Sequence, residues 1–280
     1  MKRLVWVRTA PPDEPGSMAA YGELVRRAVE PLADGWEWAT CDLFDPRGGA
    51  SMWRHHLWRL RNARRALAAQ SADLFHWLDG SMAAFIPSAL RGRSLATVHD
   101  LIPLLQWHGE LPGTPSWPAT WLIRRGVRAL AECAALCADS AATRADLARL
   151  AGIAEHVAVV PLPLRSLPPP RPAAVPGLPS GARFILHVGH NAPYKNRLGV
   201  VDVYARLRDV PDLHLVLAGP PPTRELQARS AGLANVHFAG PVDDAALHDL
   251  YRRAALLLFP SLYEGYGMPV LEAMAAGCPV

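Results

Sequence analysis

Short apolar runs alternate with helical patterns of apolar and polar residues along most of the chain. Each apolar run has the length of a buried strand, and each helical pattern repeats its apolar positions every three to four residues. In the first half, strands are predicted at residues 3–8, 36–44, 73–78, 94–99, 135–140 and 156–160. Helices are predicted between them at residues 21–32, 51–70, 119–133 and 143–151. This alternation indicates a parallel sheet covered by helices.

A proline-rich stretch interrupts the alternation. Residues 161–181 contain eight prolines, which favour an extended and stiff chain. The alternation then restarts, with strands predicted at residues 183–188, 213–218, 235–239 and 254–259. The accompanying helices are predicted at residues 196–207, 223–231, 243–253 and 268–276. We therefore place an N-terminal domain at residues 1–165, a proline-rich linker at residues 166–181 and a C-terminal domain at residues 182–280.

The last predicted strand is followed by a glycine-bearing turn and then by a helix. Gly265 and Gly267 allow the backbone to approach a ligand, and the start of the helix offers N–H groups and a partial positive charge. Glu264 lies in the turn, and Glu272 lies about one turn into the helix. N–H groups suit a phosphate, while carboxylates accept hydrogen bonds from sugar hydroxyls. The stretch therefore predicts a nucleotide-sugar pocket.

Glu264 and Glu272 are separated by seven residues within the string FPSLYEGYGMPVLEAMAAGCPV. The string resembles the E-x7-E signature of the retaining glycosyltransferases of family 4, also called group 1. This resemblance implies an α/β protein of the GT-B fold, with two Rossmann-like, doubly wound parallel-sheet domains facing a cleft. Members of the family continue beyond the position of Val280, so the resemblance also implies a second domain that is incomplete at its C-terminus.

The same resemblance assigns roles to the residues of the turn. Glu272 is implied to hold the ribose hydroxyls, and Glu264 the donor sugar or its nearer phosphate. The backbone N–H groups implied to hold the diphosphate belong to Gly265, Tyr266, Gly267 and Met268. No protein nucleophile is evident. By resemblance, the leaving phosphate oxygen takes the acceptor's proton while the new bond forms on the same face of the sugar.

The segment HVGHNAPYKN follows the first strand of the second predicted domain. It contains Lys195, which with Lys2 makes up all the lysine of the chain. A compact ammonium on a strand-end loop suits a departing diphosphate. By resemblance, Gly189 and Lys195 belong to the donor site, where the family usually has an arginine shortly after the glycine. His190 and Asn191 occupy that place here, which predicts one fixed cation fewer.

Two residues of the first predicted domain are further site candidates. His99 directly follows a predicted strand and precedes Asp100, and ligands of open α/β sheets bind at the carboxyl ends of strands. The string VHDLIPL resembles the His-Asp turn of mannosyltransferase-like members of family 4, so His99 is implied to lie beside the transferred sugar. Gly16, in the loop after the first strand, is the remaining donor-binding candidate, although the family often has paired glycines there.

The helix predicted at residues 51–70 has two different stripes. The stripe expected to pack contains Trp53, Leu57, Leu60 and Leu67. The opposite stripe contains Arg54, Trp58, Arg61 and Arg65. The second stripe fits either a solvated, partly packed helix or a basic, aromatic face that meets an anionic membrane or a lipid-linked acceptor. Nucleic acid is not expected, because no binding motif accompanies the patch. Residues 104–120, with Trp107 and Trp117, are expected to form an irregular loop.

Composition narrows the class of protein further. The chain has 280 residues, of which half are hydrophobic, and a net charge of +4. Its apolar runs are shorter than a membrane span and no signal peptide is evident, so we expect a cytoplasmic protein with, at most, peripheral contact at the inner face of the membrane. The cysteines and histidines lack the spacing of a metal site, so no metal and no cofactor besides the nucleotide-diphosphate sugar substrate is expected.

These features predict a retaining glycosyltransferase that transfers a hexose, such as mannose, from a nucleotide-diphosphate sugar. The expected acceptor is a glycan or a lipid-linked molecule in the synthesis of cell-surface polysaccharide or glycolipid. Two alternatives stay open. One is a non-catalytic protein that binds a nucleotide-sugar or a partner, as the missing arginine would favour. The other is a different GT-B enzyme, such as a nucleotide-sugar epimerase.

Overall fold

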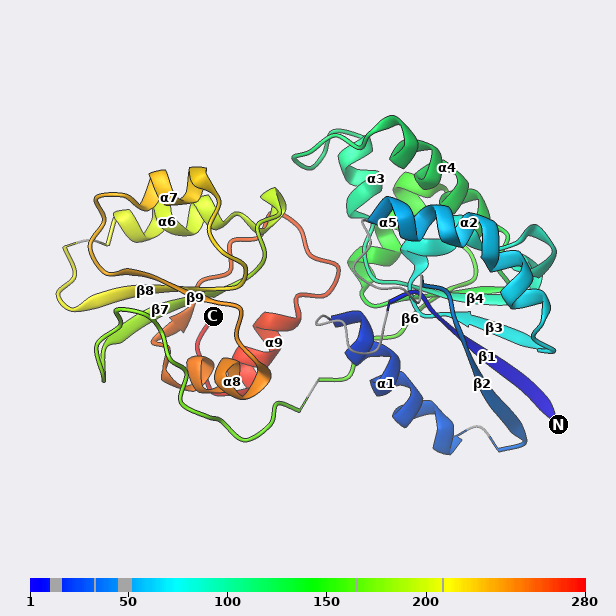
Figure 1. Ribbon diagram of the computed structural model, residues 1–280, viewed down its shortest axis with the longest axis horizontal. Coiled ribbons are helices and arrows are strands. Elements are labelled where there is room, and N and C mark those ends of the chain that lie inside the picture. The colour runs from blue at the N-terminus through cyan, green and yellow to red at the C-terminus, as the bar shows by residue number, and fades with distance from the viewer. Residues whose placement is uncertain (11–16, 33, 45–51, 165, 208) are drawn as a thin grey trace. The chain divides into compact units, whose positions relative to one another are not determined.

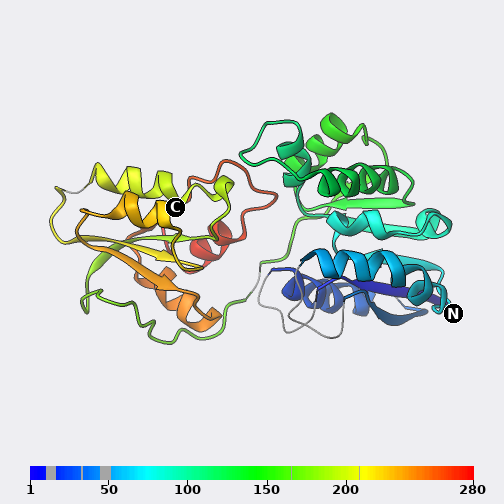
Figure 2. The same cartoon turned by 45° about the horizontal axis from the view of Figure 1, so that its top comes forward.

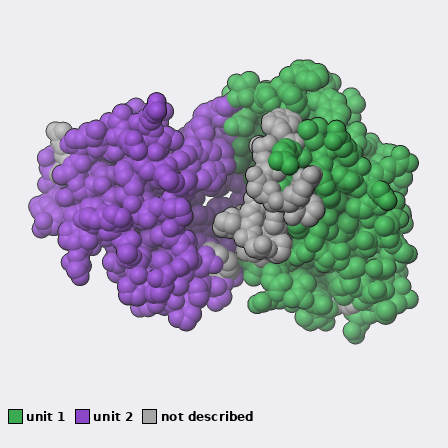
Figure 3. Space-filling model, viewed as in Figure 1, with its two compact units in different colours: residues 1–110, 114–163 green, residues 111–113, 164–280 purple. Residues whose placement is uncertain are grey.

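The computed structural model describes residues 1–10, 17–32, 34–44, 52–164, 166–207 and 209–280 (Figure 1). For residues 17–20 and 52–53 it describes the backbone alone. The chain divides into two compact units, which Figure 3 colours separately. Unit 1 contains residues 1–110 and 114–163, and unit 2 contains residues 111–113 and 164–280.

Unit 1 is built on a six-stranded sheet in which all neighbouring strands are parallel. The strand order is β2-β1-β3-β4-β5-β6. The strands are β1 (Lys2–Arg8), β2 (Trp36–Asp42), β3 (Leu74–Trp77), β4 (Ser94–Val98), β5 (Ala135–Ala138) and β6 (Val157–Val159). The central strands are apolar on both faces, as the buried run from Leu4 to Val7 shows, because helices cover both sides of the sheet.

The helices of unit 1 are α1 (Ser17–Val29), α2 (Met52–Ala68), α3 (Ile102–Trp107), α4 (Trp117–Ala131) and α5 (Ala141–Ala151). Shorter 3-10 helices are η1 (Glu30–Leu32), η2 (Gly80–Phe85) and η3 (Ser88–Arg93). The chain steps from β1 to β2 and then back across β1 to β3, so right-handed crossovers place α1 and α2 on opposite faces. Figure 1 shows this arrangement, with α4 and α5 on the same face as α2.

Unit 2 contains a four-stranded parallel sheet in the order β10-β7-β8-β9. Its strands are β7 (Arg183–Val188), β8 (Leu213–Ala218), β9 (Val236–Gly240) and β10 (Leu256–Leu257). Its helices are η4 (Pro193–Lys195), α6 (Arg197–Ala205), α7 (Arg224–Ser230), α8 (Asp244–Arg253) and α9 (Met268–Ala275). Figure 1 shows α6 and α7 on one face of this sheet and α8 and α9 on the other.

The packing stripe predicted for α2 is right at Leu67, which is buried in the core, and wrong at Leu57 and Leu60. Leu57 and Leu60 are 51% and 44% exposed, whereas Arg59 is buried in the helix face that packs inward. The Arg59 guanidinium donates hydrogen bonds to the carbonyl oxygens of Leu43 and Thr9, which compensate for the burial of its charge. The leucine pattern does not reveal that Arg59 faces inward, because the carbonyl groups that bind Arg59 belong to loops distant in the sequence.

The irregular loop predicted at residues 104–120 is confirmed only for residues 108–116. The other residues of this range form most of α3 and the beginning of α4. The Ile102 N–H donates to Asp100 Oδ1 at 3.0 Å, and Pro103 and Pro118 lie in the first turns of α3 and α4. Proline is favoured at the start of a helix, so Pro118 helps to begin α4 inside the range that was predicted as an irregular loop.

The proline-rich segment packs on unit 2. The Arg171 N–H donates to the Ala245 oxygen at 3.1 Å, the Ala173 N–H donates to Asp249 Oδ2 at 2.9 Å, and Val175 is buried in the core beside α8. These contacts fix much of the segment predicted as a linker along the surface of α8.

Candidate active site

Lys195 and Glu264 form a bidentate ion pair in unit 2, although they are 69 positions apart in the chain. The Lys195 Nζ atom lies 2.7 Å from Oε1 and 2.8 Å from Oε2 of Glu264. Both side chains are largely buried, with exposed fractions of 13% and 23%. The ammonium also lies over the rings of Tyr194 and Phe259. The structure therefore brings together two residues that the sequence places in the donor site.

Hydrogen bonds join the two loops that carry this pair. Asn196 adopts a left-handed conformation with φ of 54°, which asparagine tolerates better than most residues, and its side chain caps α6. The same side chain donates from Nδ2 to the Pro260 oxygen at 3.0 Å. The Leu262 N–H donates to the Tyr194 oxygen at 2.7 Å. Lys195 and the loop before Glu264 are thus held in a fixed relation at the carboxyl edge of the sheet.

Gly189 lies at the end of β7 among closely packed backbone. A Cβ atom on Gly189 would lie 2.9 Å from His187 Nε2, and a Cβ on Gly219 would lie 2.2 Å from the Gly189 oxygen. The Gly189 N–H donates to the Ala218 oxygen at 3.1 Å. Packing alone therefore requires glycine at these positions. A role of Gly189 in donor binding stays a prediction.

The loop that carries Glu264 leads directly into α9. Gly267 caps the helix with φ of 83°, a left-handed conformation that favours glycine, and Met268 begins the helix. Gly265 and Tyr266 lie in the same half-buried loop. Glu272 lies one turn further on, is only 5% exposed and accepts a hydrogen bond from the Tyr251 hydroxyl at 3.1 Å. The residues of the predicted E-x7-E element thus surround the start of α9.

His190, which occupies the place of the family arginine, makes the hydrogen bonds of a neutral imidazole. Its Nδ1 atom accepts from the Ala192 N–H at 3.2 Å, and its Nε2 atom lies 3.2 Å from the Tyr194 hydroxyl. Burial, followed by the charge of Lys195, lowers the pKa of His190. His190 therefore does not replace the missing positive charge at neutral pH.

Arg197 is a buried cation that the sequence interpretation missed. It lies in the first turn of α6 and is only 5% exposed. Its Nη1 atom donates to Asn191 Oδ1 and to the Pro220 oxygen, the latter at 3.1 Å, and burial lowers its pKa. Within the described part of the chain, its Nε and Nη2 atoms are buried without partners and it forms no ion pair. The sequence could have indicated Arg197, because it directly follows Lys195-Asn196. Arginine is so common in this chain, however, that one more did not stand out.

His99 follows β4 in unit 1, as predicted, and both of its ring nitrogens have partners. Nδ1 lies 2.5 Å from Asp139 Oδ2, and Nε2 lies 2.8 Å from the Leu78 oxygen. Both partners are acceptors, so the ring donates from both nitrogens and is an imidazolium. Burial lowers the pKa of His99, but the hydrogen bond and charge of Asp139 outweigh it and raise the pKa above its ordinary value. Asp139, which is 1% exposed, was not singled out from the sequence.

This pairing predicts a pH dependence of stability. Because the pKa of His99 is raised on folding, its contribution to the free energy of unfolding is complete below about pH 6.5 and is lost as the pH rises through the folded pKa. Burial lowers the pKa of His76 to about 4, so the titration of His76 changes the free energy of unfolding only below pH 6.5. We therefore expect urea unfolding to show that the wild type loses stability above pH 6.5, whereas His99→Gln does not lose it in the same way. Parallel pH profiles of the two proteins in that range would contradict the charged pair.

The remaining expectations concern Gly16, metals and membrane spans. Gly16 lies outside the described residues. Within the described ranges there is no group of three or more potential metal ligands, and the four cysteines are unpaired. No helix in those ranges combines the length and apolar character needed to cross a membrane. The structure also leaves the roles assigned to His99, Glu264 and Glu272 toward a donor as predictions.

Several solved structures have a fold similar to that of this chain. The chain superimposes on sucrose-phosphate synthase from Thermosynechococcus elongatus with a TM-score of 0.72 and 18% identity, covering 100% of this chain and 80% of that one. HepE from Anabaena, solved in complex with UDP and glucose, gives a TM-score of 0.66 and 18% identity with the same coverages. These likenesses, with the two parallel sheets, show that the protein has the GT-B fold.

Sequence comparisons identify the family. The O-antigen chain mannosyltransferase B of Escherichia coli is 33% identical over 104 residues, which are 35% of this chain and 27% of that protein. The alignment thus spans about a quarter of the length of this relative. The model for group 1 glycosyl transferases matches residues 172–280, and the model for Glycosyltransferase Family 4 matches residues 25–164, half of the chain. The chain belongs to glycosyltransferase family 4.

Proposed function

We propose that this protein is a retaining hexosyltransferase that uses a nucleotide-diphosphate sugar as its donor. The observation that carries the proposal is the contact between Lys195 and Glu264 beside the start of α9. This arrangement combines a cation, a carboxylate and a helix N-terminus within one edge of a parallel sheet, where open α/β sheets bind ligands. A cation suits the diphosphate, and a carboxylate suits the sugar hydroxyls.

Each residue has a specific part in the proposed reaction. Lys195 and the backbone N–H groups from Gly265 to Met268 receive the diphosphate, while Glu272 accepts hydrogen bonds from the ribose. Glu264 exchanges its contact with Lys195 for one with the donor sugar. Arg197 lies under the loop between Gly189 and Lys195 and adds positive charge to the same region. This charge supports turnover over the non-catalytic alternative, for which the absent family arginine was the reason.

The proposed chemistry is a transfer with retained stereochemistry. The bond between the sugar and the diphosphate breaks, and the electron pair leaves with the diphosphate oxygen. The acceptor hydroxyl forms the new bond on the same face of the sugar, and its proton passes to the departing oxygen. Because a negative charge develops on the diphosphate, fixed positive groups lower the barrier most, and one such group contributes about 3 kcal/mol.

For the donor and the acceptor we propose only the chemical class. The Escherichia coli relative is named as a mannosyltransferase for O-antigen, and the Anabaena structure contains UDP and glucose. These likenesses fit a hexose donor and a glycan or lipid-linked acceptor. The proposed reaction takes place in the cytoplasm and belongs to the synthesis of cell-surface polysaccharide or glycolipid. A screen of nucleotide-sugars by thermal shift, followed by donor consumption with and without candidate acceptors, would test the assignment. Donor turnover without any acceptor product would favour an epimerase, and donor binding without turnover a non-catalytic protein.

The two glutamates should differ in their kinetic roles. Glu264→Gln should lower kcat more than it raises the donor KM, because Glu264 is proposed to contact the sugar as its bond breaks. Glu272→Gln should mainly raise the donor KM, since a ribose contact serves the ground state and the transition state alike. Steady-state kinetics would measure both effects, with Glu225→Gln as a control on the exposed surface of α7. Wild-type kinetics in both variants would remove the basis of the proposed function.

A further inference from the structure

Helices α2 and α4 are unusual in their charge. Neither contains an acidic residue over its full length, although together they contain eight arginines. Both lie on the same face of the unit 1 sheet, and the two views in Figures 1 and 2 agree on this placement. The 3-10 helix η2 packs against both of them. The two helices therefore place their arginines on the same face of unit 1.

Six of the arginines in this layer point outward. Arg54, Arg61, Arg64, Arg65, Arg124 and Arg128 are exposed, and none forms an ion pair with another described residue. Helix α1, on the opposite face of the sheet, shows what a solvated helix does in this protein. There, Arg26 and Arg27 are paired with Glu23, and Arg26 also with Glu30. The positive charge over α2 and α4 has no such internal partner.

Large apolar side chains lie among these arginines. On α4, Trp117 is 81% exposed and Trp121 is 46% exposed. Trp121 lies about one turn before Arg124 and two turns before Arg128, and Trp117 lies one turn before Trp121 on the same helix face. On α2, Leu57 and Leu60 are 51% and 44% exposed beside the outward arginines. Tryptophan and leucine placed between arginines are typical of helices that lie in the interface of a bilayer.

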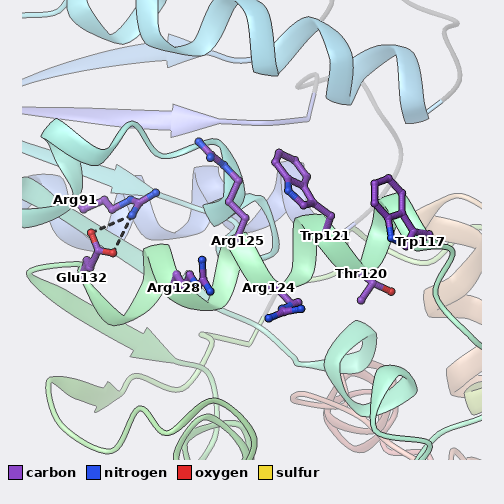
Figure 4. A pocket seen from close by; sticks show the side chains of 8 residues that line it. All are labelled: Arg91, Trp117, Thr120, Trp121, Arg124, Arg125, Arg128 and Glu132. Atoms are coloured by element: carbon purple, nitrogen blue, oxygen red, sulfur yellow. Dashed lines mark hydrogen bonds and ion pairs between the residues drawn. The ribbon is translucent and has the colours of Figure 1, made fainter.

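A recess of about 550 Å³ lies along α4 between these side chains. Figure 4 shows the residues around it, with Arg91 and Glu132 paired at one end and Trp117 at the other. Arg125 lies over the Trp121 ring and donates to the Ala84 oxygen at 2.6 Å, so its charge is fixed in place. Glu132 offsets the charge of Arg91, so the recess combines the fixed guanidinium of Arg125 and the exposed Arg124 and Arg128 with an aromatic side wall, which suits an anionic headgroup.

We propose that the α2–α4 face, defined by the six outward arginines with Leu57, Leu60, Trp117 and Trp121, binds the surface of an anionic lipid bilayer. The inference concerns unit 1 only and does not depend on the donor site. It extends the membrane face predicted on α2 to α4, which carries Trp117, Trp121 and the recess, and it leaves out Trp58, which is half-buried. A bilayer fits better than a soluble polyanion, since phosphate contacts would use the arginines but leave Trp117 and both leucines in water.

Vesicle sedimentation with the whole protein tests this proposal. Vesicles of phosphatidylcholine with about 30% phosphatidylglycerol should bind the wild type, whereas pure phosphatidylcholine should bind it at least tenfold more weakly, because arginines near the surface are attracted to anionic headgroups. Arg124→Glu/Arg128→Glu and Arg61→Glu/Arg64→Glu should each weaken binding at least tenfold. Trp117→Ala/Trp121→Ala should weaken it without any change in charge.

The control is Arg206→Glu/Arg252→Glu, which makes the same charge change at two exposed arginines of unit 2. It should retain most of the binding, and thermal unfolding should show that all variants remain folded. An equal loss in this control would mean attraction by net charge alone and would overturn the proposal. Unchanged binding by the tryptophan variant, together with equally tight binding of dextran sulfate, would overturn it in favour of a soluble polyanion. Absent vesicle binding would overturn it while leaving the proposed transfer reaction untouched.

Discussion

Lys195→Ala is expected to weaken the binding of a nucleoside diphosphate about 100-fold, or by about 3 kcal/mol, while the affinity for the free nucleoside stays close to that of the wild type. The substitution removes a charged donor from the diphosphate. It also leaves Glu264, only 23% exposed, without its counter-ion, so that an uncompensated carboxylate faces the incoming phosphate. Both effects act on the charged part of the ligand and spare the nucleoside.

Calorimetry with the diphosphate and the nucleoside would measure this difference. Lys2→Ala is the matched control, because Lys2 is the other lysine of the chain and lies in β1 of unit 1. The double variant Lys195→Ala/Glu264→Gln should recover part of the lost affinity, since it removes the repelling charge. Equal losses for diphosphate and nucleoside would instead point to a collapsed pocket, and the assignment of Lys195 to the phosphate would fail.

Arg197→Met is expected to weaken diphosphate binding about tenfold, as the loss of one nearby charge at an effective dielectric constant of about 20 predicts. At the same time the free energy of unfolding should stay equal or rise by about 1–2 kcal/mol. Burial without a carboxylate partner makes this guanidinium costly, and replacing buried charges with apolar groups of similar size often stabilises a protein. A gain in stability with a loss of ligand affinity is typical of a functional site.

Urea unfolding and calorimetry on the same samples would measure the two effects. Arg197→Lys should keep much of the diphosphate affinity, because it keeps the charge. Arg229→Met serves as the control, since Arg229 is exposed and paired with Asp202 at 2.8 Å. If Arg197→Met destabilises the protein and leaves diphosphate binding unchanged, Arg197 only ties together the loops at Asn191 and Pro220, and it has no part in the donor site.

The sequence predicts best those elements that local burial determines. The ranges predicted for β7 and β8 match the structure residue for residue, because both strands are apolar runs bounded by polar turns. The strand predicted at residues 254–259 shrinks to Leu256–Leu257, since among the described strands β10 lies at the edge of the sheet and pairs only with β7. Pattern alone cannot measure how far an edge strand continues its pairing.

Elements and contacts that depend on distant partners were predicted less well. The inward face of α2 depends on carbonyl groups at Leu43 and Thr9, which no helical periodicity contains. The partner of His99 is Asp139, which lies 40 positions away, directly after the neighbouring strand β5. Lys195 and Glu264 were each assigned to the donor site through resemblance, but their direct ion pair follows only from the three-dimensional structure.

That ion pair has a consequence for the reaction cycle. If Lys195 binds the donor diphosphate as proposed, the carboxylate of Glu264 competes with the donor for Lys195, and part of the intrinsic affinity for diphosphate is used to separate the pair. After transfer, the sugar no longer occupies Glu264, and the carboxylate can recapture the ammonium and expel the diphosphate product. The strength of a single internal contact would thus set a balance between capture of the donor and release of the product.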